Sequence, residues 1–330
     1  MMKRAMPATP PTAPRFPRVL VTGAAGFVGS HLVRELRSAG HEVLTTDALP
    51  PDAPAAAGLP GYAQADLRDA AAVRALLRAT RPDGVIHLAA VSFVPDGARD
   101  PSLALTVNVG GTMALAEGLL AEAPAARLLF VSTAQVYGTT RSAAPLREDA
   151  PLLPVSLYAV TKVAGESLLR GLCAARGLDA VIARPGNHTG PGQSPKFVAV
   201  AFARQVLAAA RGELREIRVG NLDSVRSFAD VRDVVHAYRL LLERGRTGQA
   251  YNVAADADVR IGELLDRLRA LAGTDAPAVA DPALYRPADA CQSLDASLLR
   301  EETGWAPRLT LDETLRDILA DLAARSPAPA

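Results

Sequence analysis

The sequence has few cysteines, almost no net charge and no long uninterrupted apolar run. Its two cysteines, Cys173 and Cys291, are far apart and lack metal-ligand spacing, so they predict neither a disulfide framework nor a metal site. With 36 basic and 35 acidic residues, the net charge of +1 favours neither nucleic acid nor a membrane surface. No run approaches the ~18 consecutive apolar residues typical of a membrane helix. We therefore expect a soluble, cytoplasmic protein with a small-molecule partner.

Lysine is also scarce. Only Lys3, Lys162 and Lys196 occur among the 36 basic residues, and all the others are arginines. An ammonium on a flexible stem and a planar guanidinium perform different tasks. The two internal lysines are therefore candidates for specific roles.

The pattern of apolar residues predicts a doubly wound α/β fold. Short runs rich in Val, Ile and Leu alternate with segments of helical periodicity, as in a parallel Rossmann-type sheet with helices on both faces. The predicted strands are Arg18–Thr22, Glu42–Thr46, Tyr62–Ala65, Gly84–Leu88, Arg127–Ser132, Ala180–Ala183, Ile217–Val219 and Ala250–Val253. The predicted helices begin near Gly26 and span Pro101–Ala121, Ser156–Ala175, Phe197–Arg211, Val231–Glu243, Ile261–Ala272 and Leu311–Ala324.

A chain of 330 residues exceeds the usual size of one domain. We expect residues 1–17 to be a disordered leader, because they are rich in Pro, Thr and Ala and lack the apolar stretch of a secretory signal. Residues 18–186 plus about 229–255 should form a dinucleotide-binding domain. Residues from about 187 to 228, plus 256–325, should form a smaller α/β substrate-binding lobe, followed by a tail at 326–330.

A glycine-rich turn follows the first predicted strand. Gly23, Gly26 and Gly29 form a GxxGxxG pattern that opens a helix, where the absence of Cβ lets the backbone approach a pyrophosphate at the helix N-terminus. Asp47 ends the second strand, where a carboxylate can accept hydrogen bonds from ribose hydroxyls and would repel a 2′-phosphate. NAD is therefore favoured, with NADP possible. The further residues expected to contact the cofactor are Phe27, Val28, Asp66, Leu67, Leu88, Ala89, Ala90, Ser132, Tyr158 and Lys162. For Asp66 and Leu67 the alternative is a role in capping the helix that begins near Asp69.

Tyr158 and Lys162 are expected to carry the acid–base chemistry. They stand at positions i and i+4 of a predicted helix, and therefore on one face. The ammonium of Lys162 and a positive nicotinamide should both favour the phenolate and lower the pKa of Tyr158. Thr133, at the carboxyl end of the fifth strand, can donate a hydrogen bond to a substrate carbonyl. Its alternative role is to satisfy the local backbone.

These motifs, in this order, resemble the extended short-chain dehydrogenase/reductase superfamily over residues 18–325. His87-Leu88-Ala89-Ala90 and Asn108 are similar to its cofactor-side motifs. The resemblance implies a nucleotide-sugar substrate. It also implies a homodimer formed through the helices Pro101–Ala121 and Ser156–Ala175.

Three segments resemble one branch of that superfamily, the GDP-4-keto-6-deoxy-D-mannose reductases, also called GDP-D-rhamnose synthases. These segments are Arg184–Gln193, Val219–Phe228 and Leu284–Asp289. The resemblance implies that Asn187, Val198, Arg226 and Arg286 bind the GDP moiety, and arginine does give forked contacts to a diphosphate. Lys196 is a further candidate for a phosphate contact.

Two positions beside Thr133 narrow the reaction. Related 4,6-dehydratases carry an acid and a base there, whereas this chain has Ala134 and Gln135. Relatives that epimerise C3 and C5 carry a cysteine where Ala134 stands. We therefore expect NAD(P)H-dependent reduction of a GDP-4-keto-6-deoxyhexose at C4, giving GDP-D-rhamnose or GDP-6-deoxy-D-talose for surface polysaccharide. The alternatives are an NAD-dependent nucleotide-sugar 4-epimerase and, more remotely, a non-catalytic dinucleotide sensor.

Overall fold

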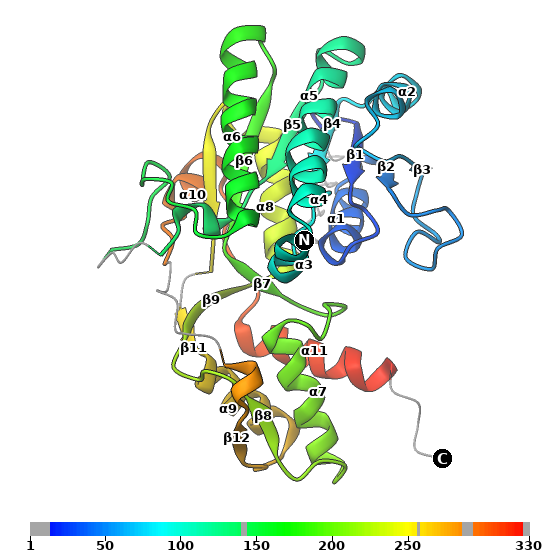
Figure 1. Cartoon of the computed structure of the whole chain (residues 1–330). Helices are drawn as coiled ribbons and strands as arrows, with labels where there is room; N and C mark the ends of the chain where they lie inside the picture. Colours follow the sequence, from blue (N-terminus) through cyan, green and yellow to red (C-terminus); the bar gives the residue numbers. More distant parts are fainter. Residues whose placement is uncertain (1–13, 140–143, 256–257, 286–292, 326–330) are drawn as a thin grey trace, which may run out of the picture.

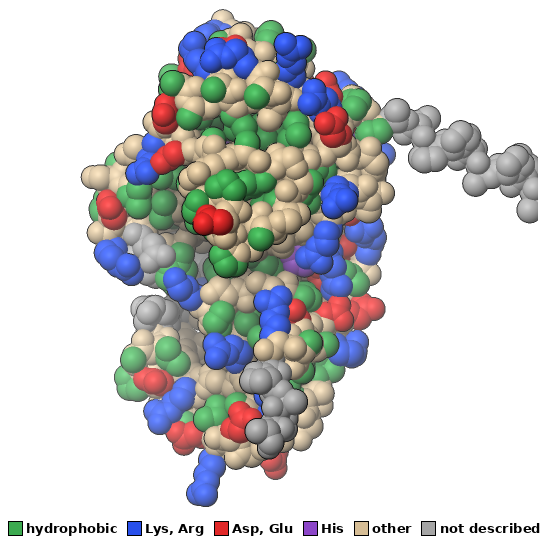
Figure 2. Space-filling view, turned by 90° about the vertical axis from the view of Figure 1, so that its right-hand side faces the viewer, with side chains coloured by type: hydrophobic (Ala, Val, Ile, Leu, Met, Phe, Trp, Pro, Cys, Tyr) green, Lys and Arg blue, Asp and Glu red, His purple; other side chains and the backbone are tan. Residues whose placement is uncertain are grey.

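The structure is a computed structural model that describes residues 14–139, 144–255, 258–285 and 293–325. Figure 1 shows two groups of elements, with the larger group above the smaller one. Most of the expected leader and the whole tail at 326–330 lie outside the described residues. Figure 2 shows acidic and basic side chains interspersed over one face of the molecule, in keeping with the net charge of +1.

The larger group is built on one sheet of seven parallel strands in the order β10-β6-β5-β4-β1-β2-β3. Successive strands extend from β1 first to one side and then to the other, which creates a switch point between β1 and β4, where such sheets bind ligands. This confirms the predicted Rossmann-type α/β fold. The strands are β1 (Arg18–Thr22), β2 (Glu42–Asp47), β3 (Tyr62–Gln64), β4 (Gly84–His87), β5 (Arg127–Val131), β6 (Ala180–Pro185) and β10 (Ala250–Val253).

Helices cover both faces of this sheet. On one face α1 (Phe27–Ser38) packs beside α8 (Val231–Arg244), and their apolar side chains form a core with those of β1, β5 and β6. On the other face α2 (Ala70–Thr80), α5 (Gly111–Glu122) and α6 (Leu157–Arg176) enclose a second core. Strands buried on both faces need nearly continuous apolar sequence, and every residue of β4 and β6 is buried.

The predicted helix Pro101–Ala121 is three consecutive segments. They are α4 (Pro101–Leu105), a π-helical turn η1 (Thr106–Gly110) and α5. By length and composition the run Pro101–Glu122 is apolar enough to cross a membrane, and 44% of its most apolar window is buried in the structure. This departs from the sequence expectation, which counted only uninterrupted apolar residues. Leu115 and Leu119 of α5 are fully buried in the core beside α2.

The smaller group contains a three-stranded and a two-stranded sheet. The first comprises β7 (Asn187–Thr189), β9 (Val225–Asp230) and β11 (Asp258–Arg260), and the second β8 (Ile217–Val219) and β12 (Ala278–Ala280). Helices α7 (Val198–Ala210), α9 (Ile261–Ala272) and α11 (Leu311–Arg325) enclose a third core. The remaining elements are α3 (Val94–Arg99), η2 (Ala134–Tyr137), η3 (Pro282–Leu284) and α10 (Ser297–Thr303).

The predicted division of the chain into lobes stays a prediction, although two elements bear on it. β9 leads directly into α8, so the chain passes from the smaller group back to the larger one. α10 lies within the segment 256–325, yet it packs on α8 and β10 of the larger group. Trp305, just after α10, is fully buried in the same core.

Candidate active site

The main cavity opens at the carboxyl ends of the parallel strands, between the two groups of elements. Its volume is about 1060 Å³. The cofactor residues predicted from sequence all line it, namely Gly23, Gly26, Phe27, Val28, Gly29, Asp47, Asp66, Leu67, Leu88, Ala89, Ala90, Ser132, Tyr158 and Lys162. The predicted substrate residues Thr133, Asn187, Lys196, Val198 and Arg226 line it as well. Arg286 lies outside the described residues.

The glycine loop leaves no room for side chains. Gly23 has a φ of +69°, and a Cβ there would lie 2.7 Å from the amide nitrogen of Ala89. A Cβ on Gly29 would lie 2.5 Å from the carbonyl oxygen of Ala24. Gly26 caps the N-terminus of α1 without any side-chain hydrogen bond. The first residues of this helix line the cavity, an arrangement that suits a phosphate at the helix N-terminus.

Asp47 stands at the end of β2 beside this loop. Its carboxylate accepts hydrogen bonds from the amides of Ala25, at 3.3 Å, and Ala48, at 2.8 Å. The hydroxyl of Thr46, buried next to it, has no hydrogen-bond partner in the part of the chain that the structure describes. A buried polar atom of this kind fits a site that is completed by a ligand.

Asp66 does not cap a helix. Asp69 takes that role, because its carboxylate accepts from the amides of Ala71 and Ala72 at the start of α2. Asp66 instead forms a two-pronged ion pair with Arg68, with a shortest contact of 2.5 Å. Both residues of this pair line the cavity, near the end that Asp47 occupies.

Tyr158 and Lys162 lie on one face of α6, as predicted. Lys162 Nζ donates to the carbonyl oxygen of Val131 at 2.8 Å and lies 5.8 Å from the centre of the Tyr158 ring. Burial lowers the pKa of Lys162 to about 8, and burial raises the pKa of Tyr158 above its ordinary value. The prediction that the Tyr158 pKa is lowered included the charge of a positive nicotinamide and stays a prediction, whereas the chain's own surroundings raise the pKa through burial. The phenol therefore keeps its proton at neutral pH.

Thr133 is buried at the start of η2. Its hydroxyl oxygen accepts a hydrogen bond from the amide of Gln135 at 3.2 Å, so the alternative role in the local backbone is present. Because the Thr133 oxygen is the acceptor in this hydrogen bond, its hydroxyl proton can still be donated to another group. Thr133 and Tyr158 both line the cavity, and η2, which Thr133 precedes, packs against α6, which carries Tyr158.

A buried ion pair behind Ser132 was missed by the sequence reasoning. Glu166 and Arg184 are each 1% exposed and meet at 2.6 Å, and Glu166 also accepts from the Ser132 hydroxyl at 2.6 Å. Arg184 donates in addition to the hydroxyl of Tyr137 at 2.8 Å. Glu166 follows Lys162 by four residues, so the spacing of the Tyr158–Lys162 pair continues for one more helical turn. This four-residue spacing could have indicated from sequence that Glu166 lies on the same face of the helix as Tyr158 and Lys162.

His87 and Asn108 support the cavity from behind rather than lining it. The side chain of Asn108, in the π turn, accepts from the amide of Val91 at 2.7 Å and donates to the Thr161 hydroxyl at 3.0 Å. It therefore ties the loop after β4 to the helix that carries Tyr158. His87 is fully buried, and burial lowers its pKa to about 3, which keeps the ring neutral.

On the side of the smaller group, aromatic and basic residues meet the larger group. Phe197, just before α7, packs edge-on against Phe93 with ring centres 6.1 Å apart. Lys196 Nζ lies 4.9 Å from the centre of the Phe93 ring. Arg226, on β9, donates to the carbonyl oxygen of Val225 at 2.8 Å. The cavity is thus basic at this end.

Carboxylates are confined to the other end of the cavity. Among the described residues that line it, only Asp47 and Asp66 are acidic, and both lie beside β2 and β3. Ala134 and Gln135 follow Thr133, and Gln135 lines the cavity without a titratable group. Within the described ranges, no group of three or more His, Cys, Asp or Glu side chains could hold a metal ion.

Comparison with known proteins gives consistent matches over nearly the whole chain. Residues 20–318 match the GDP-mannose 4,6 dehydratase family. The chain is 37% identical to GDP-6-deoxy-D-mannose reductase of Pseudomonas aeruginosa over 311 residues, which covers 93% of this chain and 98% of that enzyme. It is 36% identical to a UDP-glucose 4-epimerase of Mycolicibacterium smegmatis, covering 90% of this chain and 95% of the epimerase. The structure of RMD from Pseudomonas aeruginosa complexed with NADPH matches with a TM-score of 0.84 and 35% identity, covering 94% of this chain and 99% of that one.

Proposed function

This chain belongs to the GDP-mannose 4,6-dehydratase family within the extended short-chain dehydrogenases/reductases, and we propose that it is a nucleotide-sugar 4-ketoreductase. Its reaction is the NAD(P)H-dependent reduction of the C4 keto group of a GDP-4-keto-6-deoxyhexose. The product is GDP-D-rhamnose or its C4 epimer, GDP-6-deoxy-D-talose, and serves the synthesis of surface polysaccharide. The name of the P. aeruginosa relative, a GDP-6-deoxy-D-mannose reductase, supports this assignment.

One observation carries the proposal: Thr133, Tyr158 and Lys162 line the cavity together, and no carboxylate among the described lining residues lies beside them. Removing a proton from C5 and protonating a leaving hydroxyl at C6, as in dehydration, needs an acid and a base in addition to the tyrosine. Ala134 and Gln135 can supply neither. Hydride exchange at one carbonyl needs only a proton donor and an oxyanion stabiliser, and both are present.

The roles of the three side chains follow from their protonation and position. A bound nicotinamide dinucleotide supplies the hydride. Tyr158, whose pKa is raised by burial, keeps its proton and donates it to O4 of the sugar. Thr133 donates its hydroxyl proton in a hydrogen bond to the same oxygen. Lys162 is held by the carbonyl oxygen of Val131 and positions the nicotinamide ribose.

Asp47 supports a preference for NADH over NADPH. Its carboxylate is fixed by the amides of Ala25 and Ala48 where the adenosine ribose would lie. A 2′-phosphate would meet this negative charge at close range. The P. aeruginosa structure contains NADPH, and Arg68, which lines the same end of the cavity, is the residue through which this chain would tolerate that cofactor.

The opposite end of the cavity supports a GDP-linked substrate. Asn187, Val198, Arg226 and Lys196 line it, and the guanidinium and ammonium groups suit a diphosphate. Exposed apolar side chains on α4, on α5 and beside the start of α6 support a homodimer through these helices. They are Leu103, Leu105, Met113, Val155 and Val160.

The proposal is tested by incubating the purified protein with GDP-4-keto-6-deoxy-D-mannose and NADH. We expect net oxidation of NADH with formation of a 6-deoxyhexose product. The alternative 4-epimerase predicts interconversion of a non-keto sugar without net cofactor oxidation, and that result would rule out the reductase. A non-catalytic sensor predicts that the Tyr158→Phe variant keeps its cellular function. GDP, UDP and dTDP compared in a thermal-shift assay identify the preferred base.

A further inference from the structure

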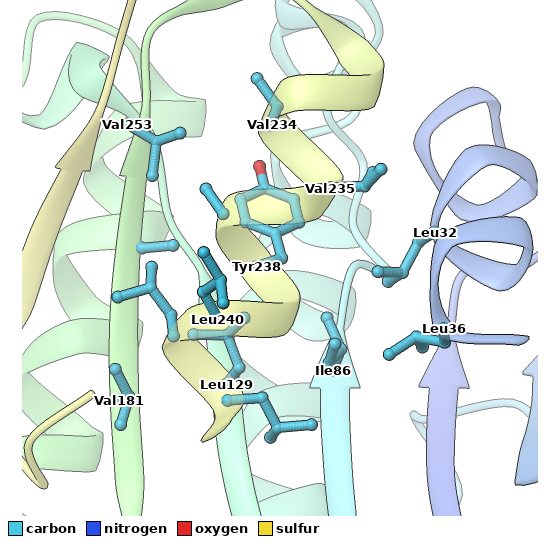
Figure 3. Close-up of a cluster of buried hydrophobic side chains, with 14 of the residues drawn as sticks. Leu32, Leu36, Ile86, Leu129, Val181, Val234, Val235, Tyr238, Leu240 and Val253 are labelled. Atoms are coloured by element: carbon cyan, nitrogen blue, oxygen red, sulfur yellow. The ribbon is translucent and has the colours of Figure 1, made fainter. Parts of the chain in front are cut away.

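Tyr238 carries a buried hydroxyl that nothing in the proposed reaction uses. The residue lies on α8, is fully buried and contributes to the lining of the main cavity. Its Oη has no hydrogen-bond partner among the residues that the structure describes. Figure 3 shows the ring among apolar side chains, with the hydroxyl directed away from Leu240 and toward the level of Val234 and Val253.

An unpartnered hydroxyl at this place requires an explanation. A buried polar group without a hydrogen bond loses its hydration and gains nothing in return, and such groups are rare in folded proteins. Phenylalanine would fill the same volume among the same apolar neighbours. The hydroxyl of Tyr238 therefore points to a partner that arrives with a ligand.

The position of Tyr238 identifies the part of the ligand that it would meet. Its ring belongs to the core formed with β4, β5, β6 and β10, directly below the carboxyl edge of the sheet. Ser132 and Gly186 follow β5 and β6 and line the cavity, so Tyr238 lies at the reacting end of the cavity and not at the Asp47 end beside β2. Burial and Tyr158 both raise the pKa of Tyr238, which makes its hydroxyl a hydrogen-bond donor at all physiological pH values.

We infer that Tyr238 Oη donates a hydrogen bond to the carboxamide group of the bound nicotinamide ring, and so fixes the rotation of the ring. The inference rests on the proposed nicotinamide dinucleotide. The ring must lie near Tyr158 for hydride exchange, and apart from the ribose on its nitrogen the carboxamide is its only polar substituent. A hydroxyl donor surrounded by apolar side chains suits the carbonyl oxygen of that group. The apolar side chains around it would contact the face of the ring. Tyr238 would then be a cofactor-positioning residue on a helix to which the sequence motifs assign no role.

The test compares ligands with and without nicotinamide. Dissociation constants for NADH and ADP-ribose are measured by calorimetry on the full chain, for the unchanged protein and for Tyr238→Phe. We expect NADH binding to weaken about tenfold, the ordinary worth of one hydrogen bond, and ADP-ribose binding to stay unchanged. Equal weakening of both ligands, or no change in NADH binding, would overturn the inference. Unchanged ADP-ribose binding also reports that the variant is folded.

Tyr251→Phe is the matched control. Tyr251 is fully buried in the same core, but its hydroxyl donates to Glu302 and accepts from the amide of Arg246, outside the cavity. We expect this variant to lower the melting temperature of the free protein and to leave NADH binding unchanged. Tyr238→Phe should weaken NADH binding without lowering the melting temperature of the free protein, because it removes an oxygen that has no hydrogen-bond partner among the described residues. A fall in melting temperature with Tyr238→Phe as large as that with Tyr251→Phe would count against the inference.

If Tyr238→Phe does not fold, a second measurement on the unchanged protein tests the inference. A dinucleotide analogue with pyridine in place of nicotinamide lacks the carboxamide, and the unchanged protein should bind it at least tenfold more weakly than NAD. Equal binding of the two would overturn the inference. If the protein binds no nicotinamide dinucleotide, both the inference and the proposed function fail. If it binds NADH but does not reduce the keto sugar, only the proposed function fails.

Discussion

Replacing Glu166 by glutamine should destabilise the protein and also shift the pH dependence of its activity. The carboxylate of Glu166 accepts from Arg184 at 2.6 Å and from Ser132 at 2.6 Å, and its side chain is 1% exposed. Removing its charge leaves the guanidinium of Arg184 buried without an anion. Breaking a buried pair in this way typically costs about 3–5 kcal/mol. Glutamine can still accept one of these hydrogen bonds, so we expect the lower part of that range.

For a chain of 330 residues, a loss of about 3 kcal/mol corresponds to a fall in melting temperature of roughly 4–5 °C. Glu263→Gln is the matched control, because its pairing with Arg267 on α9 is solvent-exposed and worth at most about 0.5 kcal/mol. Differential scanning calorimetry of both variants measures the contrast. Equal melting temperatures for the two variants would refute the assignment of stability to the buried pair.

The same substitution should also act on Lys162. Burial lowers the pKa of Lys162 to about 8, and the negative charge of Glu166 raises it, so removal of that charge lowers it further. Lys162 is an ammonium only below its pKa. The rate of keto-sugar reduction should therefore fall as the pH rises through about 8 in the unchanged protein, and at a lower pH in Glu166→Gln. If the role of Glu166 were purely structural, the substitution would lower the melting temperature, and the rate would still fall at a pH of about 8.

Three further substitutions test the cavity. Tyr158→Phe should lower the rate of reduction by roughly 10²–10⁴-fold and leave NADH binding intact, as measured by NADH oxidation and calorimetry; a smaller loss would remove Tyr158 from the role of proton donor. Gly29→Ala should weaken NADH binding at least tenfold, because its Cβ would lie 2.5 Å from a carbonyl oxygen of the loop. Gly171→Ala on α6 has open space around its Cβ and should change binding by less than about twofold. Asp47→Ser should improve NADPH binding relative to NADH by about tenfold in competition titrations, and an unchanged ratio would contradict the role assigned to Asp47.

The parallel sheet could be predicted from sequence because its strands are buried on both faces. Predicted strands Arg18–Thr22 and Ala250–Val253 coincide with β1 and β10, and the other predicted strands of this sheet end within two residues of the observed ones. A continuous apolar run bounded by turn residues marks such strands in the sequence itself. In contrast, β7, β9, β11 and β12 were not predicted. Three of these have only three residues, and their positions depend on pairing with distant segments.

The cofactor and catalytic part of the cavity could be assembled from motifs because these motifs stand at the ends of parallel strands or on α6. All the predicted site residues that the structure describes line one cavity, although their roles remain proposals. The features that were missed depend on tertiary contacts. Glu166 and Arg184 are 18 residues apart in sequence, and the lack of a partner for Tyr238 Oη follows only from the packing around α8. The burial that raises the pKa of Tyr158 is a tertiary property as well.

That direction bears on the choice between reductase and epimerase. A 4-epimerase begins by removing a proton from the sugar hydroxyl, so its tyrosine must start as a phenolate, whereas a reductase must start with the phenol protonated. Burial raises the pKa of Tyr158, and burial also lowers the pKa of Lys162 to about 8. With NADH, whose nicotinamide ring is uncharged, the phenol keeps its proton and can donate it to the ketone, whereas the positive ring of NAD would favour the phenolate that an epimerase needs. Both reactions use the same three side chains, so net consumption of NADH, rather than the motif, distinguishes them.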